Sequence, residues 1–298
     1  MKLAIVLAAV GCVDSSDPGG SWVDASTITG TLAPELGPPP ATRAAPDCTL
    51  RIATWNLHTA PDPANLAAQI LASQELSSAD VIITQEIEAH PNEPGSRAQR
   101  LADALGMTWV YAPSRIEGNG THGIAILSRY QLEAAAVRAL PFVARPISDV
   151  HRIALGADVL IGTDRIRVVD IHLDTRLSAE DRIRQMHAAV NEVGEDMIAG
   201  GDLNSQPWPW IDGVVPLTST DAVIGQEHAR ILDDYMSQNR FIGAVSPTTA
   251  TMRIPVFSMR LDNLYARGFS IVASGVDHVD GSDHWPVWFD LAWGQCRR

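Results

Sequence analysis

Positive charge is scarce in this sequence. Its 298 residues include 22 Lys and Arg against 35 Asp and Glu, a formal net charge of −13. Because nucleic acids attract proteins through broad basic surfaces, this balance argues against tight nonspecific binding of DNA or RNA, although a local cationic groove is compatible with it. Every basic residue except Lys2 is an arginine. Arginine suits bidentate phosphate recognition, but a coding bias explains the same composition without any function, and we favour that explanation.

The N-terminus has no apolar run long enough to cross a membrane. The run from Leu3 to Val10 follows Lys2 and is too short to span a bilayer, but it is typical of an export signal. Small residues precede Cys12 in a pattern that resembles a bacterial lipoprotein box, with Ala9 where leucine is usual. We therefore expect a signal peptide over residues 1–12, with Cys12 as the candidate lipidation site. The protein would be exported to the periplasm or cell surface, or secreted. An ordinary signal peptide or a buried first strand is the alternative.

Cysteine is rare, with three residues in the whole chain. Three cysteines in an exported protein leave one unpaired unless it has another role, and lipidation of Cys12 would supply that role. Cys48 and Cys296 flank the region predicted to fold, just before its first strand and just after its last. We expect a disulfide between them that closes the two ends of the domain.

The composition changes at about residue 48. Residues 13–47 are rich in Ser, Thr, Gly, Ala and Pro and show no helical or strand periodicity, so we expect a flexible tether outside the core. From 48 to 298, short apolar runs alternate with amphipathic stretches, which is typical of an α/β domain whose strands are covered by helices. The predicted strands cover residues 51–55, 81–84, 124–127, 153–160, 166–171, 197–200, 261–266 and 287–291. The predicted helices cover residues 64–74, 97–105, 178–193 and 229–238.

Polar side chains follow several of these apolar runs. In sheets covered by helices, ligands bind in the crevice at the strand ends, so such side chains are expected to converge. Each residue alone has an ordinary interpretation, because asparagine forms turns and a single glutamate or histidine is usually solvated or hydrogen-bonded. Together they predict an active site. The residues are Asn56, Glu86, His172, Asp202 and Asn204, with Asp283 and His284 near the C-terminus.

The same residues belong to an ordered set of motifs that resembles the endonuclease/exonuclease/phosphatase superfamily. That superfamily includes pancreatic-type deoxyribonucleases, abasic-site endonucleases, neutral sphingomyelinases and inositol-phosphate phosphatases. The resemblance implies a four-layer α/β sandwich, with two packed mixed sheets flanked by helices, and metal-dependent attack of water on a phosphate ester. The matching segments are ATWN (53–56), TQE (84–86), GIAILSR (123–129), DIHLD (170–174), GDLN (201–204), RLD (260–262) and SDHWP (282–286).

The expected metal is Mg²⁺, with Mn²⁺ as the alternative. Glu86 offers hard carboxylate oxygens, and Mg²⁺ is typically held by one or two carboxylates while it keeps waters and contacts substrate phosphate. Zinc is disfavoured because the sequence has no Cys/His ligand cluster. Asn56 would help to hold the metal or a phosphate oxygen, and Asp283 would aid metal or water binding.

Asp202 is the candidate to orient and deprotonate the attacking water, with Asn204 positioning the same water or the developing charge. By resemblance, His284 contacts the transferring phosphoryl group and Asp262 orients its imidazole. A neighbouring carboxylate would raise the pKa of that histidine and favour the imidazolium, which stabilises charge on phosphate oxygens.

His172 is the second candidate catalytic histidine. In the deoxyribonuclease branch its counterpart assists the leaving group and is supported by a glutamate. Here His122 stands at the apparent place of that glutamate. A phosphate-binding role is therefore expected for His172, and a general-acid role lacks its usual support. Arg182 and Gln185, at helical spacing after His172, are expected to be structural hydrogen bonders.

The substrate depends on loops. The inositol-phosphatase segment Pro-x-Trp-Cys-Asp-Arg is absent, and residues 257–262 read Phe-Ser-Met-Arg-Leu-Asp. Trp208 and Trp210 could stack on nucleobases, enter a lipid interface or pack in the core. Arg145 and Arg152 could steer an anion or be ordinary surface residues. We expect a phosphodiesterase for nucleic acid, monomeric and without an obligate protein partner. The alternatives are a sphingomyelinase- or phospholipase C-like enzyme, a small phosphomonoesterase and, more remotely, a noncatalytic binding protein.

Overall fold

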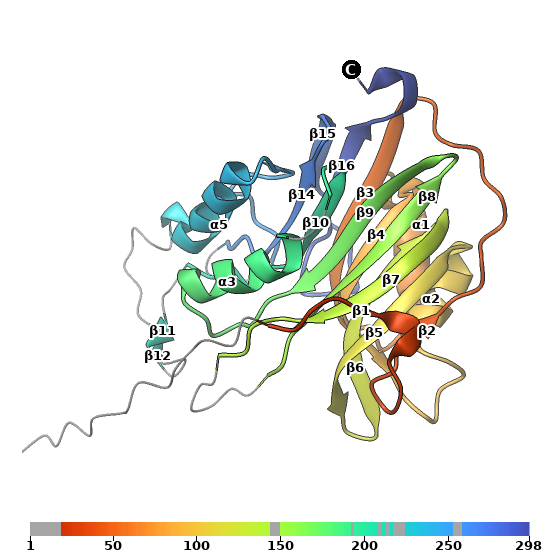
Figure 1. Ribbon diagram of the computed structural model, residues 1–298, viewed down its shortest axis with the longest axis horizontal. Coiled ribbons are helices and arrows are strands. Elements are labelled where there is room, and N and C mark those ends of the chain that lie inside the picture. The colour runs from red at the N-terminus through yellow and green to blue at the C-terminus, as the bar shows by residue number, and fades with distance from the viewer. Residues whose placement is uncertain are drawn as a thin grey trace, which may run out of the picture.

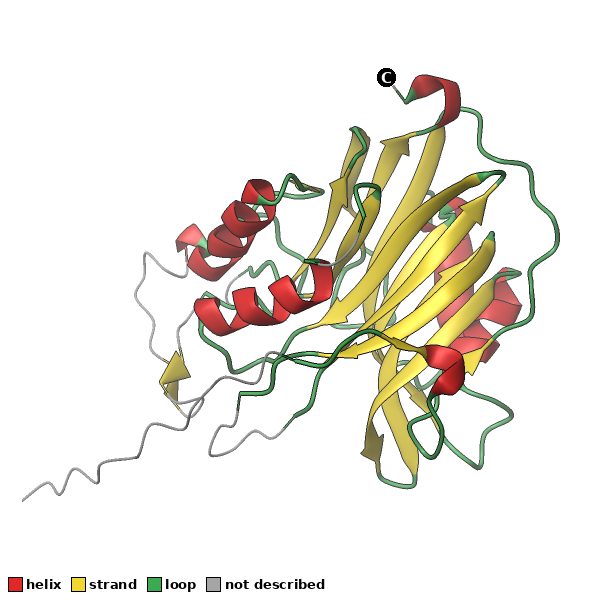
Figure 2. Ribbon diagram, viewed as in Figure 1, coloured by secondary structure: helices red, strands yellow, loops and turns green. Residues whose placement is uncertain are grey.

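Two mixed sheets of seven strands each pack against one another, with helices on their outer sides (Figures 1 and 2). The structure is a computed structural model, and it describes residues 19–143, 150–191, 194–207, 210–211, 215–216, 224–252 and 258–297. The predicted four-layer α/β sandwich is confirmed. No helix in these residues is both long enough and apolar enough to cross a membrane.

Both sheets contain strands from distant parts of the chain. The first consists, in spatial order, of β1 (Val23–Asp24), β7 (Gln131–Ala139), β8 (Ile153–Ile161), β9 (Asp164–His172), β10 (Met197–Asp202), β14 (Asp262–Arg267) and β13 (Ile242–Gly243). The second consists of β15 (Ile271–Val276), β16 (Val287–Ala292), β3 (Thr49–Thr59), β4 (Val81–Ala89), β6 (Gly120–Ser128), β5 (Thr108–Glu117) and β2 (Glu35–Leu36). β11 (Trp210–Ile211) and β12 (Val215–Pro216) form a separate pair.

In the described part of the chain, four longer helices lie on the outer faces. They are α1 (Pro63–Ala72), α2 (Arg97–Leu105), α3 (Ala179–Val190) and α5 (Glu227–Gln238). Short 3₁₀ turns lie at η1 (Ala25–Thr27), η2 (Leu76–Ser78) and η3 (Gly294–Cys296). All the predicted strands and helices are present, with ends shifted by a few residues. The prediction missed β5, β7 and β15, besides the two-residue strands.

The strands read as continuous apolar runs because both faces of the sheets are covered. On β4, Val81 and Ile83 belong to the cluster between the sheets, whereas Ile82 belongs to the cluster beneath α1 and α2. A third cluster joins β9 and β10 to α3 and α5, with Met186 and Leu232 as helix contributions. Three apolar layers therefore hold the four structural layers together.

Local signals fix where the helices begin and end. Asp62 is the N-cap of α1, and its carboxylate accepts a hydrogen bond from the N–H of Asn65. Pro63 is the first residue of the helix. Ser96 caps α2 in the same manner, and Ser178 caps α3. Side-chain caps of this kind satisfy the free N–H groups of the first turn.

The predicted flexible tether is wrong for the part of it that the structure describes, residues 19–47. β1 pairs with β7, β2 pairs with β5, and Ala25 is 1% exposed within the core between the sheets. In Figure 1 this red and orange segment passes the edges of both sheets, where β1 and β2 lie, before it enters β3. Strands of two residues are too short to show an alternating pattern, so they could not be predicted from the sequence. We call residues 19–47 the N-terminal strap.

Cys48 and Cys296 form a disulfide, as predicted, and so join the start of β3 to the end of the domain. The predicted signal peptide and Cys12 lie outside the described residues, as do residues 13–18 of the predicted tether. Export and lipidation therefore stay predictions.

Candidate active site

Three neighbouring strands of the first sheet bring acidic and histidine side chains to one place. β10 runs parallel to β9 and antiparallel to β14. Its last residue, Asp202, lies opposite His172 on one side and Asp262 on the other. Residues paired across adjacent strands have neighbouring Cβ atoms, so strand register alone collects this part of the site.

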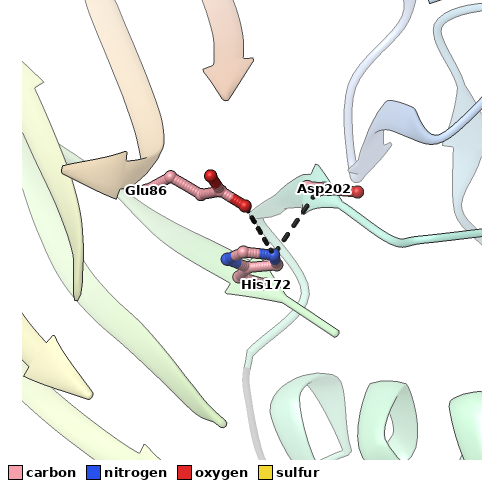
Figure 3. Close-up of side chains that lie close together, drawn as sticks. All are labelled: Glu86, His172 and Asp202. Carbon is pink, nitrogen blue, oxygen red and sulfur yellow. Dashed lines mark ion pairs between the residues drawn. The ribbon is translucent and has the colours of Figure 1, made fainter. Parts of the chain in front are cut away.

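The second sheet supplies Glu86 from β4 and Asn56 from the parallel strand β3. Glu86 sits in an irregularity of the ladder between Gln85 and Ile87, with a positive φ of 55°. Non-glycine residues rarely adopt this conformation, and such strain concentrates at functional sites. Figure 3 shows the result, with the Glu86 and Asp202 carboxylates both directed toward His172.

Glu86, His172 and Asp202 form a compact group. The His172 Nε2 lies 3.4 Å from an Asp202 carboxylate oxygen and 3.9 Å from one of Glu86 (Figure 3). One ligand atom of each residue lies within 4.8 Å of those of the other two, a spacing that could hold a metal ion. Asp202 and His172 are buried, whereas the Glu86 side chain is 28% exposed and opens the group to solvent.

Two hydrogen bonds hold the Asp202 carboxylate. The Asn56 side-chain amide donates to Oδ2 at 2.9 Å, and the Asn204 backbone N–H donates to Oδ1 at 2.9 Å. Burial raises the pKa of Asp202 above its ordinary value. A bound cation would favour the ionised carboxylate, and the hard oxygens of Glu86 and Asp202 suit Mg²⁺ or Mn²⁺. The residues therefore fit the expected metal.

Asp202, Asp262 and His284 form a second group, which shares Asp202 with the first. The Nδ1 of His284 lies 2.8 Å from the Oδ2 of Asp262. Burial alone would lower the pKa of His284, but attraction to Asp262 and the hydrogen bond between them outweigh it and raise the pKa to about 10. A pKa of about 10 favours the imidazolium at neutral pH, the direction expected from a neighbouring carboxylate.

Neighbouring groups fix the Asp262–His284 pair. The Thr251 hydroxyl donates to Asp262 at 2.7 Å and accepts the Asp262 N–H at 3.0 Å. The Ser282 hydroxyl accepts the His284 N–H at 3.1 Å and donates to the Asn56 carbonyl at 2.7 Å. Sequence reasoning gave no role to Thr251 or to the hydroxyl of Ser282. Ser282 could have been found from its place in the SDHWP motif, whereas Thr251 lies in a loop without a pattern.

His172 has a partner that the sequence did not indicate. Its Nδ1 lies 3.0 Å from a guanidinium nitrogen of Arg152, and both side chains are buried. His122 is also buried, but its Nδ1 has no hydrogen-bond partner among the described residues. Burial first, and then the charges of Arg115 and Arg152, lower the pKa of His122 to about 3. Arg152, rather than a glutamate, is therefore the side chain that contacts the Nδ1 of His172.

Two predicted site residues lie differently from expectation. Asp283 belongs to neither group, because its carboxylate faces His58 at 3.5 Å and is 40% exposed. Asn204 has a positive φ of 46°, and its side-chain amide donates to the Leu173 carbonyl at 3.0 Å. Its backbone N–H thus contacts Asp202 while its side chain secures the loop. Metal binding by Asp283 and water positioning by Asn204 stay predictions.

Arg182 and Gln185 have the structural role that was predicted for them. The Arg182 guanidinium donates to the carbonyls of Leu177 and Thr175, and the Gln185 amide donates to the carbonyl of Pro141. The side chains of Arg145, Trp208 and Trp210 lie outside the described part of the chain.

Residues 53–284 match the model of the Endonuclease/Exonuclease/phosphatase family, a span that contains both groups of the site. The chain belongs to this family. Its members generally hydrolyse phosphate esters and typically depend on a divalent metal, and the two groups of this chain could hold such an ion. No curated protein matches the sequence.

Several solved structures share the fold. An endonuclease/exonuclease/phosphatase family protein from Leptotrichia buccalis C-1013-b is 16% identical, with a TM-score of 0.62 over 82% of this chain and 100% of that one. A mannosyl-6-phosphatase from Bacteroides thetaiotaomicron VPI-5482 is 15% identical, with a TM-score of 0.55 over 82% and 100%. An AP endonuclease from Archaeoglobus fulgidus is 17% identical, with a TM-score of 0.55 over 80% and 98%. Identities this low establish the fold and leave the substrate undetermined.

Proposed function

We propose that this protein is a Mg²⁺-dependent phosphodiesterase that cleaves nucleic acid. One observation carries the proposal: the buried carboxylate of Asp202 belongs to two groups of side chains. The first contains Glu86 and is open to solvent, and the second contains His284, whose raised pKa favours the imidazolium. Hydrolysis of a phosphodiester needs a base for water and positive charge for the phosphoryl oxygens, and this arrangement offers both. Mn²⁺ would serve as a substitute for Mg²⁺.

Each side chain then has a distinct task. Asp202, fixed by Asn56 and by the N–H of Asn204, orients the attacking water and accepts its proton. The His284 imidazolium, held by Asp262, donates to a phosphoryl oxygen and stabilises its growing charge. Glu86 would hold the cation together with an oxygen of Asp202. When bound, Mg²⁺ supplies charge neutralisation at the phosphate and lowers the pKa of water.

Nucleic acid is the proposed substrate because an aromatic pair adjoins the catalytic residues in sequence. Trp285 follows His284 and lies against the exposed ring of His278, with ring centroids 4.2 Å apart. Aromatic rings beside a phosphate site can stack on nucleobases. The net charge of −13 does not oppose this, because contact at a few nucleotides does not require a basic face.

Export is part of the proposal. The apolar run ahead of Cys12 supports a signal peptide, and the disulfide between Cys48 and Cys296 supports an oxidising compartment. An exported enzyme of this kind would act on extracellular nucleic acid, either secreted or tethered through Cys12.

Parallel hydrolysis assays test the proposal. The full chain is assayed with Mg²⁺ or with a chelator against plasmid DNA, RNA, sphingomyelin vesicles, bis(p-nitrophenyl) phosphate and p-nitrophenyl phosphate. We expect chelator-sensitive cleavage of DNA or RNA that is lost in Asp202→Asn. Cleavage of sphingomyelin alone, or of the monoester alone, would overturn the substrate class. Cleavage that persists in Asp202→Asn would overturn the assignment of the site.

A further inference from the structure

The contact between Arg152 and His172 determines where the imidazole carries its hydrogen. A guanidinium has only N–H donors and cannot be deprotonated in a protein, so the Nδ1 of His172, 3.0 Å away, must accept the hydrogen bond. A neutral imidazole carries a single N–H. With Nδ1 as the acceptor, that hydrogen lies on Nε2.

The strand order builds this contact. Arg152 directly precedes β8, which pairs antiparallel with β9, and Ala154 lies opposite Ile171 in that ladder. His172 is the last residue of β9, so the two side chains meet at the same end of the sheet. Arg152 is 8% exposed, and no carboxylate of the described residues lies within ion-pair distance of it. Among the described residues, its guanidinium makes one hydrogen bond, the contact with His172.

The Nε2 of His172 is a buried donor without an acceptor in the described part of the chain. It faces Asp202 at 3.4 Å and Glu86 at 3.9 Å, beyond a well-formed hydrogen bond in each case (Figure 3). Buried polar groups normally have partners, so an unpaired donor in an active site indicates a place where a ligand supplies the acceptor. A phosphoryl oxygen meets that need.

Metal coordination requires the opposite arrangement. A metal-bound histidine presents a bare nitrogen to the ion and donates its other N–H to a carboxylate, a carbonyl or water. Here a cationic donor occupies Nδ1, and Nε2 keeps its hydrogen. A general acid would need a second proton on Nδ1, directly against the guanidinium, so that role is excluded by the same contact.

We propose that Arg152 is a positioning residue that fixes His172 as a neutral Nε2–H donor for a phosphoryl oxygen, so that His172 is neither a metal ligand nor a general acid. The identity of the acceptor rests on the proposed function, whereas the position of the hydrogen does not. Arg152 thereby supports His172 in place of a glutamate, although from a different part of the chain, and it has the opposite chemical effect because it donates where a carboxylate would accept.

Nitrogen-15 NMR of the histidine rings in the full-length wild-type protein tests the position of the hydrogen directly. The His172 resonances are assigned by their loss in His172→Gln. We expect the neutral form with hydrogen on Nε2, without added metal and with Mg²⁺. Hydrogen on Nδ1, or on both nitrogens, would overturn the proposal. Arg152→Lys keeps a donor and should keep this form. Arg152→Met removes the donor, so His172 should become a mixture of the two neutral tautomers.

Cation binding and kinetics give a second readout. Calorimetric titration with Mg²⁺ should give a Kd for His172→Gln close to wild type, and a loss of about 10-fold or more would make His172 a metal ligand after all. Arg152→Met should lower kcat about 10- to 100-fold with little change in KM, and Arg152→Lys should recover most of the lost kcat.

The two proposals can fail separately. A protein that hydrolyses no phosphoester but shows hydrogen on Nε2 would refute the proposed function alone. An active enzyme with hydrogen on Nδ1 would refute this inference alone.

Discussion

Asp202 has a different environment on each of its two sides. One side faces Glu86 and His172, and the other faces Asp262 and His284. Hydrogen bonds from Asn56 and Asn204 hold the carboxylate, and both come from residues at strand ends. The motifs in the sequence identified these residues by type. They did not show that Asn56 contacts Asp202, because that contact depends on how two distant sheets pack.

Replacing Asp202 by Asn should lower kcat at least about 100-fold, because the amide cannot accept a proton from water. The near-identical shape should leave the fold intact, which circular dichroism and the unfolding midpoint would check. Glu195→Gln is the matched control, since Glu195 pairs with Arg240 on the surface with 72% and 70% of the two side chains exposed. It should leave kcat unchanged. Equal losses in both variants would contradict the assignment.

The pH dependence should report the Asp262–His284 pair. The pKa of His284 is raised to about 10 from an ordinary 6.5, so the imidazolium, and activity with it, should be lost as pH rises through about 10. Because the folded pKa lies above the unfolded one, the pair stabilises the fold most below pH 6.5, and this contribution fades as pH rises to about 10.

Asp262→Asn removes the attraction that raises this pKa. Its alkaline limb of activity should therefore move toward neutral pH, and its stability deficit against wild type should be largest below pH 6.5. Rate profiles and urea unfolding across the pH range measure both effects. An unmoved alkaline limb would show that His284 is not the group that titrates there.

At the scale of elements, the strand register brings the site residues together, and the N-terminal strap covers one edge of each sheet. The apolar runs of β9, β10 and β14 predicted the strands, and the motifs that follow them predicted the site. β5 and β7 escaped prediction because Pro113 interrupts the first and polar residues occupy both faces of the second. β15 reads Ile-Val-Ala-Ser-Gly-Val with three exposed residues, so it has neither a continuous apolar run nor a clear alternation. The strap was missed because its strands have two residues each.

Removing the strap should destabilise the domain. A variant that begins at Asp47 keeps Cys48 but loses β1, β2 and the buried Ala25. Without β1 and β2, the edges of β7 and β5 are uncovered. We therefore expect a lower unfolding midpoint and more aggregation, because free strand edges pair with other chains. Thermal unfolding and light scattering measure these changes. Wild-type behaviour would restore the interpretation of residues 19–47 as a passive tether.

The disulfide between Cys48 and Cys296 closes nearly the whole domain, with a sequence separation of 248 between the two cysteines. A paired Cys48→Ser, Cys296→Ser variant should lose about 2–5 kcal/mol of unfolding free energy, chiefly because the unfolded chain gains freedom. Urea unfolding gives the value. Since the bond lies at the ends of β3 and the domain, kcat of the folded variant should stay near wild type. A large loss of kcat with unchanged stability would contradict a purely stabilising role for the disulfide.

For the whole molecule, the four-layer fold followed from the order of motifs and from apolar runs that alternate with amphipathic stretches. The substrate does not follow from the fold, because solved structures that share this fold include a mannosyl-6-phosphatase and an AP endonuclease. Trp208 and Trp210 were the sequence features most relevant to substrate choice, and their side chains lie outside the described residues. The partnership of Arg152 with His172 was equally hidden, since it depends on the antiparallel pairing of β8 with β9.

The most direct test is the single-turnover rate of DNA cleavage by the full chain, measured with Mg²⁺, with chelator, and in Asp202→Asn with Mg²⁺. We predict cleavage by the wild-type protein with Mg²⁺ and at least about 100-fold slower cleavage in the other two conditions. Wild-type cleavage that is indifferent to chelator, or an Asp202→Asn rate equal to wild type, would contradict the metal-dependent site around Asp202.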